Sequence, residues 1–242
     1  MHSNMKQLLF GALLTLSLGA SAQKTIHDDM AQLRTVAAFH GVRVSAGIDL
    51  YLSEGDEAVA VSARSIELRD RIRTTVENGV LRIWYEWNDN KGMVWGNNKN
   101  LKAYVSAKMI DQLSASGGSD VFVDGTLHSP SLRLDLSGGA DFKGSVAVQG
   151  TLEAGISGGS DVDIKGTATV LKVSASGGSD FNGGDLTVDS CTADASGGSD
   201  VDVTVNREIR ASASGGSDVY YRGSATLAES HKSGGSDIKK RG

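Results

Sequence analysis

The chain has very little cysteine and proline, with one residue of each among 242. Because Cys191 is the only cysteine, no internal disulfide can form, and the fold must be held by packing and backbone pairing. We expect Cys191 to be a small buried packing residue rather than a reactive thiol. The histidines at positions 27, 40, 128 and 231 have no metal-ligand spacing, and no H-E-x-x-H segment occurs.

The chain also lacks an excess of positive charge. Residues 111–242 hold 11 Lys and Arg against 18 Asp and Glu, and the whole chain carries a net charge of −5. This balance argues against nucleic acid or polyphosphate as a partner, since both select a basic face. Neutral glycans, proteins and cations remain compatible with it.

Long apolar runs are missing. The longest, Leu8–Leu18, has 11 residues and is shorter than the roughly 20 that a transmembrane helix needs, so no membrane span is expected. It follows Lys6 and precedes the small residues Ala20-Ser21-Ala22, a pattern typical of a secretory signal. We predict a signal peptide over residues 1–22 and an exported mature chain in the periplasm, on the outer cell surface or outside the cell. An uncleaved anchor is the alternative.

What the chain does have is a repeat. A five-residue phrase, Ser-Gly-Gly-Ser-Asp with one Ser-Gly-Gly-Ala-Asp, occurs seven times within residues 111–242. The copies begin at Ser116, Ser137, Ser157, Ser176, Ser196, Ser214 and Ser233. A period of 18 to 21 residues predicts that one structural unit is stacked on the next.

Each unit reads as two short strands with a tight corner between them. The residue after every aspartate of the phrase is apolar, and small or apolar residues alternate before most of the opening serines. Gly-Gly suits the corner, and about 20 residues leave no room for a helix of about 12. The predicted fold is all-β, a right-handed parallel β-helix (solenoid) with about 20 residues per coil.

Residues 23–110 are predicted to be a less regular β region. Asn78-Gly79 indicates a tight hairpin between the flanking apolar segments. The region could form the first irregular coils of the solenoid or a small cap that covers its open first edge. The predicted organisation is therefore 1–22 signal peptide, 23–110 irregular region or cap, and 111–242 β-helix.

Stacking would bring the aspartates of the phrase into one column. Its members are Asp120, Asp141, Asp161, Asp180, Asp200, Asp218 and Asp237. Like charges at that spacing need compensation, either from backbone N–H groups at the corners or from calcium between coils. Calcium-binding β-rolls use G-G-x-G-x-D, whereas this phrase lacks the third glycine, so hydrogen bonding is favoured over a metal.

Aromatic residues suggest a ligand site. Trp84 lies among charged residues of a predicted strand, Trp95 lies in the polar segment 88–100, and Tyr104 is nearby. Exposed aromatics beside Asn and Asp suit a sugar ring or a protein surface. The alternative is that the segment folds over and buries both tryptophans within the cap.

Signals for catalysis are weak. Residues 155–159 match G-x-S-x-G, but Ser157 opens a repeat phrase instead of a strand-to-helix elbow. The pairs Asp161/Asp163 and Asp200/Asp202 should point outward and could serve polysaccharide cleavage. No basic residue can be placed beside them, so no catalytic residue is assigned.

Four segments, Phe39–Leu52, Val59–Val61, Asn78–Ile83 and Leu113–Val121, resemble the auto-transporter adhesin "head GIN domain" family over about residues 36–240. The resemblance implies an exported envelope protein with a right-handed β-helix, and it brings no catalytic residues. We therefore expect a non-catalytic binding or adhesin-like module without a cofactor.

We expect the partner of this module to be a glycan or a surface protein. A polysaccharide-active enzyme and a purely structural envelope protein are the alternatives. Residues 239–241 are all basic, so the last coil could be protected by charge or could pair with a second copy.

Overall fold

The computed structural model describes residues 28–87 and 100–241, so the predicted signal peptide lies outside the described residues. Within these described residues one short helix, α1 (Ile66–Arg69), accompanies the strands. The strands before residue 110 are β1 (Gln32–Leu33), β2 (Gly41–Ser45), β3 (Asp49–Glu54), β4 (Ala58–Ser62), β5 (Ile72–Glu77), β6 (Val80–Tyr85) and β7 (Lys102–Ala107). Those that follow are β8 (Gln112–Ser116), β9 (Val121–Ser129), β10 (Leu132–Ser137), β11 (Phe142–Ser157), β12 (Asp161–Gly177), β13 (Asp180–Gly197), β14 (Asp200–Gly215), β15 (Asp218–Arg222), β16 (Thr226–Gly234) and β17 (Asp237–Lys240).

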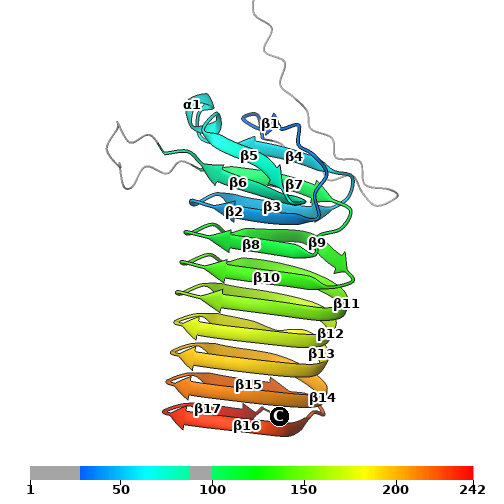
Figure 1. Cartoon of the computed structure of the whole chain (residues 1–242), viewed down its shortest axis with the longest axis vertical. Coiled ribbons are helices and arrows are strands. Elements are labelled where there is room, and N and C mark those ends of the chain that lie inside the picture. Colours follow the sequence, from blue (N-terminus) through cyan, green and yellow to red (C-terminus); the bar gives the residue numbers. More distant parts are fainter. Residues whose placement is uncertain (1–27, 88–99, 242) are drawn as a thin grey trace, which may run out of the picture.

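The strands form a solenoid of about six turns with roughly 20 residues per coil, which confirms the predicted fold (Figure 1). After each corner an outgoing strand crosses the molecule, and the chain then bends and returns to the next corner. In β11 to β14 one continuous element contains both strands and the bend. Neighbouring coils pair in parallel, as from Asp161↔Asp180 to Gly177↔Gly197 between β12 and β13. The front strands run left and the rear strands run right as the chain descends, so the coil is right-handed (Figure 1).

The region before residue 110 contributes to the coil stack and also covers its end. β2 and β3 pair in parallel with β8 and β9, and so form a regular coil directly above the first repeat phrase. β6 and β7 lie above that coil, again in parallel, while β5 and β4 add to them as antiparallel strands. We call β1, β4–β7 and α1 the cap. The cap closes the upper end of the hydrophobic core (Figure 1).

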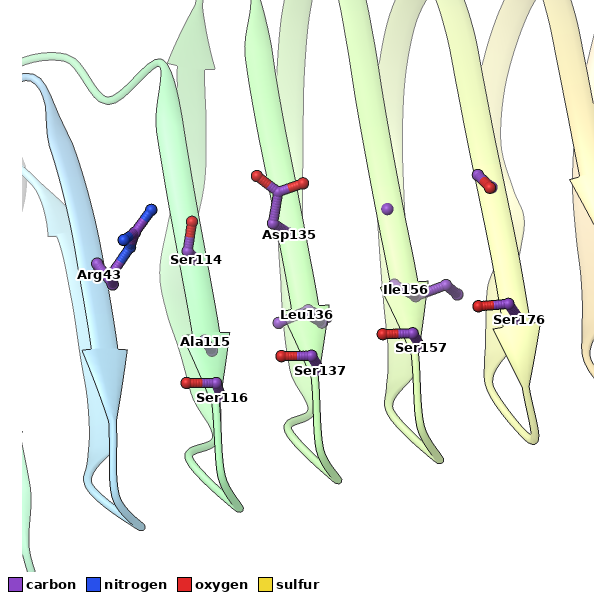
Figure 2. A pocket seen from close by; sticks show the side chains of 12 residues that line it. Arg43, Ser114, Ala115, Ser116, Asp135, Leu136, Ser137, Ile156, Ser157 and Ser176 are labelled. Carbon is purple, nitrogen blue, oxygen red and sulfur yellow. The ribbon is translucent and has the colours of Figure 1, made fainter.

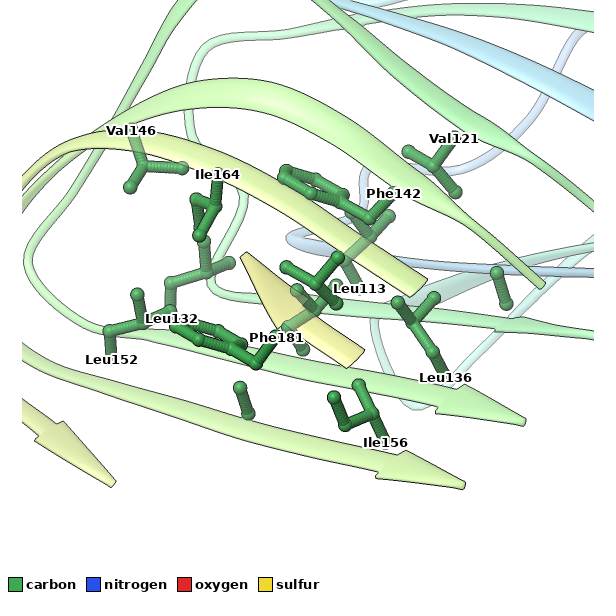
Figure 3. Close-up of a cluster of buried hydrophobic side chains, with 14 of the residues drawn as sticks. Leu113, Val121, Leu132, Leu136, Phe142, Val146, Leu152, Ile156, Ile164 and Phe181 are labelled. Carbon is green, nitrogen blue, oxygen red and sulfur yellow. The ribbon is translucent and has the colours of Figure 1, made fainter. Parts of the chain in front are cut away.

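The core is one column of apolar side chains enclosed by the coils (Figure 3). Phe142 and Phe181 are the largest of its fully buried side chains. A Cβ at Gly144 would lie 3.0 Å from Phe142 Cζ, and one at Gly183 would lie 2.5 Å from Phe181 Cε1. Coils that carry Phe after the corner aspartate thus have Gly two residues later, where coils with Val carry a larger side chain. This exchange keeps the packed volume of each coil similar.

The corners exist in two conformations. In the phrases that open at Ser116, Ser137 and Ser157, both glycines have positive φ. In the four later phrases only the first glycine does, with φ between 72° and 83°. In the last three phrases the N–H of the second glycine, Gly198, Gly216 or Gly235, donates to the carbonyl of the first glycine in the preceding coil at 2.7 Å. The same phrase therefore supports two turns, because glycine has access to both sides of φ.

Candidate binding faces of the solenoid

The solenoid presents two broad faces to solvent. The aspartate face is formed by the outward side chains of the outgoing strands, which follow each corner in β3, β9, β11–β15 and β17. The serine face is formed by those of the returning strands in β2, β8, β10–β14 and β16. Residues two apart on a strand share a face, so each face carries rows of side chains that run along the solenoid axis.

The row nearest the corners contains the aspartates of the repeat phrases. From Asp120 to Asp218, each carboxylate Oδ1 accepts a hydrogen bond from the backbone N–H of the aspartate in the next coil, at 2.9–3.4 Å. The members are Asp120, Asp141, Asp161, Asp180, Asp200, Asp218 and Asp237. The bonds link successive coils at the corners and give each carboxylate from Asp120 to Asp218 a backbone donor, which is the hydrogen-bonding arrangement expected for such corners. The described residues contain no cluster of three or more His, Cys, Asp or Glu side chains arranged to hold a metal.

Several carboxylates of this column have a shifted pKa. Burial raises the pKa of Asp120, Asp161 and Asp200, and the neighbouring carboxylates raise it further. The hydrogen bond from the next coil opposes the rise in each of these. At the lower end the ammonium of Lys239, 2.6 Å from the carboxylate of Asp237, lowers the pKa of that group. Neighbouring carboxylates of the column therefore repel one another, and the last member, Asp237, forms an ion pair with Lys239.

One rung of this column was missed by sequence reasoning. Residues 45–49 form a corner in which Ala46 and Gly47 have positive φ, 68° and 72°. Both glycines of the next corner, Gly117 and Gly118, also have positive φ. The N–H of Ile48 donates to Ser119 Oγ at 3.0 Å, and burial and Asp120 raise the pKa of Asp49. The signal was a degenerate phrase, S-x-G-x-D, which omits the second serine and the first glycine.

A second row of the aspartate face lies two residues beyond the corner. Strand pairing places its members in continuous register from the cap to the last coil. They are Tyr104, Tyr51, Phe122, Lys143, Asp163, Asn182, Asp202, Tyr220 and Lys239. The Tyr51 ring stacks on Tyr104 and on Phe122 with centroids 5.3 Å apart in both pairs. The Tyr104 hydroxyl donates to Asp28 at 2.8 Å, which anchors the stack to the segment before the cap.

Two of the three aromatic residues predicted as a ligand site, Trp84 and Tyr104, lie over different faces of the solenoid. Tyr104 belongs to the aspartate face through β7, whereas Trp84 lies on β6, above the serine face. The guanidinium of Arg82 lies 5.6 Å from the centroid of the half-buried Trp84 ring. Trp95 lies outside the described residues. Sequence reasoning did not select Tyr51, which is the aromatic partner of Tyr104, or Phe122, which stacks on Tyr51.

The paired aspartates point outward on the aspartate face but are engaged by other side chains. Asp163 accepts from the amide of Asn182 at 3.2 Å, and Asp202 accepts from Arg222 at 2.8 Å. Ser157 ends β11 and leads into a corner and a further strand, which is not a nucleophile elbow. Cys191 is buried as predicted, and burial raises the pKa of its thiol to about 12. The thiolate needed for nucleophilic chemistry is therefore scarce at neutral pH.

Each face is hollowed. A groove of about 510 Å³ crosses the serine face between Arg43 and Ser176, with Ser116, Ser137 and Ser157 in line along it (Figure 2). On the aspartate face two adjoining hollows of about 490 and 210 Å³ share Lys143, Asp163 and Asn182 in their walls.

Of the residues that the structure describes, no helix has the length and apolar character to span a bilayer.

The architecture is similar to that of several bacterial proteins of known structure. A family model described as "Putative auto-transporter adhesin, head GIN domain" matches residues 38–225. The structure resembles a putative adhesin from Bacteroides fragilis NCTC 9343, at 18% identity and a TM-score of 0.77, over 87% of this chain and 96% of the other. No curated protein matches the chain.

Two further crystal structures share the fold. A putative adhesin from Parabacteroides merdae ATCC 43184 has 12% identity and a TM-score of 0.67, over 88% of this chain and 95% of the other. A protein from Parabacteroides distasonis ATCC 8503 with the name putative lipid binding protein has 15% identity and a TM-score of 0.63, over 88% and 96%. At these identities the likeness concerns the fold alone.

Proposed function

Because the chain belongs to the putative auto-transporter adhesin, head GIN domain family, we propose that it is an exported, non-catalytic binding module of adhesin type. The solenoid acts as a rigid support, and its outward rows make contact with a partner at or outside the cell envelope. No cofactor is required in this function.

The observation that carries the proposal is the second row of the aspartate face. It offers aromatic rings, ammonium groups, an amide and carboxylates in unbroken register along a face that is also hollowed. Such groups, held on a rigid sheet, suit recognition of a surface. Asp163 and Asp202, one from each aspartate pair considered for polysaccharide cleavage, are instead held by Asn182 and Arg222, which supports binding over catalysis.

The binding function is tested with intact cells, without any assumption about ligand chemistry. Fluorescently labelled protein, residues 23–242, is titrated onto bacterial and epithelial cells, and unlabelled protein competes for the same sites. We expect saturable, competable binding to at least one cell type. Absence of saturable binding on all surfaces would favour the structural alternative, and release of oligosaccharides from the cells would favour the enzyme.

Export is tested separately. Expression of the full chain in a Gram-negative host, followed by mass spectrometry of the periplasmic and medium fractions, should find a mature protein that begins at Gln23. A full-length chain that stays in the cytoplasm or in the inner membrane would contradict the predicted signal peptide.

A further inference from the structure

We propose that the two hollows of the aspartate face form a site for a neutral, hydroxyl-rich glycan, with Phe122 at one end and Asn182 at the other. The inference rests on the proposed binding function and specifies the ligand class. The hollows lie side by side, because Lys143, Asp163 and Asn182 line both of them. We call the two together the glycan groove.

The aromatic end of the groove is a single ring face. Tyr51 stacks against one side of Phe122, while strand pairing sets Lys143 of the next coil beyond the other side. Phe122 is itself a wall of the smaller hollow. One ring face held in place by a stack, and open toward a polar groove, matches the apolar C–H face of a pyranose.

The polar walls of the groove supply both donors and acceptors. Lys143 and Lys165 are exposed, and neither side-chain ammonium forms a hydrogen bond or ion pair with the described part of the chain. Asp163 and Asp185 present acceptors beside them, and Asn182 offers an amide. Sugar hydroxyls donate and accept at once, so they can satisfy ammonium, amide and carboxylate groups in the same groove.

The charge around the groove selects against acidic ligands. Asp120, Asp141 and Asp161 line the smaller hollow in addition to Asp163, and the lysines do not balance them. A sialylated or sulfated glycan would bring further negative charge next to this column, which is unfavourable at such distances. The groove therefore fits a neutral glycan better than an anionic one.

The test is an array of neutral, sialylated and sulfated oligosaccharides probed with the wild-type chain and three variants. Phe122→Ala removes the ring face, and the double variant Lys143→Ala/Asn182→Ala removes polar groups from both hollows. The matched control, Lys172→Ala/Thr192→Ala, makes similar changes at exposed positions on the serine face of β12 and β13. Thermal melting of each variant establishes that it is folded.

We expect retention of wild-type protein on neutral glycans, a loss of about tenfold or more in affinity for both groove variants, and no change in the control. The double variant keeps the test valid if loss of Phe122 unfolds the chain. Retention only on anionic glycans, or retention that the double variant leaves unchanged, overturns the proposal.

If no glycan on the array retains the protein, the cell assay distinguishes the two proposals. If cells still bind the protein saturably, the binding function stands and the glycan class is wrong, which points to a protein partner. If cells also fail to bind it, the binding function itself is overturned.

Discussion

At the scale of single residues, the two glycines of a late corner have different tasks. A Cβ at Gly197 would lie 2.8 Å from the carbonyl oxygen of Gly177, and the φ of Gly197 is 82°. At Gly198 the nearest atom would be 3.7 Å away, and φ is not positive. The first glycine is therefore required by both sterics and backbone conformation, whereas the second is not.

We predict that Gly197→Ala lowers the free energy of unfolding by about 1–3 kcal/mol, the range expected for a residue forced into a rarely populated conformation. Gly198→Ala should change it by less than about 1 kcal/mol and can raise it, since alanine reduces the freedom of the unfolded chain. Denaturant titration of both variants measures the difference. Equal losses would mean that the corner conformation differs from the one described.

The aspartate column gives a pH-dependent prediction at the same scale. Burial raises the pKa of Asp161, and the carboxylates of Asp141 and Asp180 add to the rise. A raised pKa in the folded state means that folding favours the protonated form, so the ionised group destabilises the fold above that pKa. The destabilisation disappears as the pH falls through the folded pKa toward the ordinary value of 3.8.

Asp161→Asn removes the charge and keeps an oxygen that can accept the N–H of Asp180. We predict that it is more stable than wild type at neutral pH by about 0.5 kcal/mol, the scale of facing charges on adjacent strands. The difference should shrink as the pH approaches 3.8. Asp161→Ala, which also loses the acceptor, should be less stable than wild type at both pH values. If Asp161→Asn behaves like Asp161→Ala at neutral pH, charge repulsion in the column is negligible.

At the scale of a coil, the pairing of a large residue, Phe181, with Gly183 predicts that the stability effects of substitutions at the two positions are coupled. The next coil has Val201 and Val203 at the paired positions. Gly183→Val alone should cost about 1–3 kcal/mol because its side chain meets the Phe181 ring. Phe181→Val alone should cost about 2 kcal/mol because it leaves a cavity.

The double variant Phe181→Val/Gly183→Val should lose less free energy of unfolding than the sum of the two single losses, by more than about 0.5 kcal/mol. The reason is that the added valine side chain at position 183 fills the cavity left at position 181, and the smaller side chain at 181 removes the clash. A double-mutant cycle from denaturant titration measures this coupling. Strict additivity would show that the two positions do not share one volume.

The column of corners, taken as an element, predicts the effect of metal removal. Each Oδ1 from Asp120 to Asp218 already accepts from a backbone N–H, so the coils are joined without an ion. We predict that the thermal midpoint of the protein is the same in EDTA and in millimolar calcium. A midpoint that rises with calcium would place a cation on the column.

The sequence predicts the coils better than it predicts the cap and the groove. Repeats are visible because one corner chemistry recurs at a nearly constant interval, and each corner fixes the strands beside it. The strand order of the cap could not be predicted, because β7 lies above β3 while the chain between them folds back as antiparallel strands. Local sequence patterns do not encode such an order. The second row of the aspartate face could not be predicted either. Its members share only their position, two residues after the corner aspartate, and they have no side-chain chemistry in common.

At the scale of the whole molecule, the two ends of the solenoid differ. At the upper end the cap adds antiparallel strands and buries Val59, Val61 and Ile72. At the lower end every residue of β16 is exposed, and β16 and β17 each pair with a strand on one side only. In a stack where each coil contacts its neighbours alone, local stability should follow this asymmetry.

We therefore predict that amide hydrogen exchange is slowest in β12 and β13, remains slow in the cap strands β4 and β7, and is fastest in β16 and β17. Hydrogen-exchange mass spectrometry on the folded chain at several protein concentrations measures this gradient. The polar residues Ser230 and Lys232 stand at positions where the preceding coil has Ala211 and Ala213, and Lys232 lies 3.8 Å from Asp237. This polar end disfavours burial against a second copy. Protection of β16 that rises with protein concentration would contradict that argument and show that copies pair through this end.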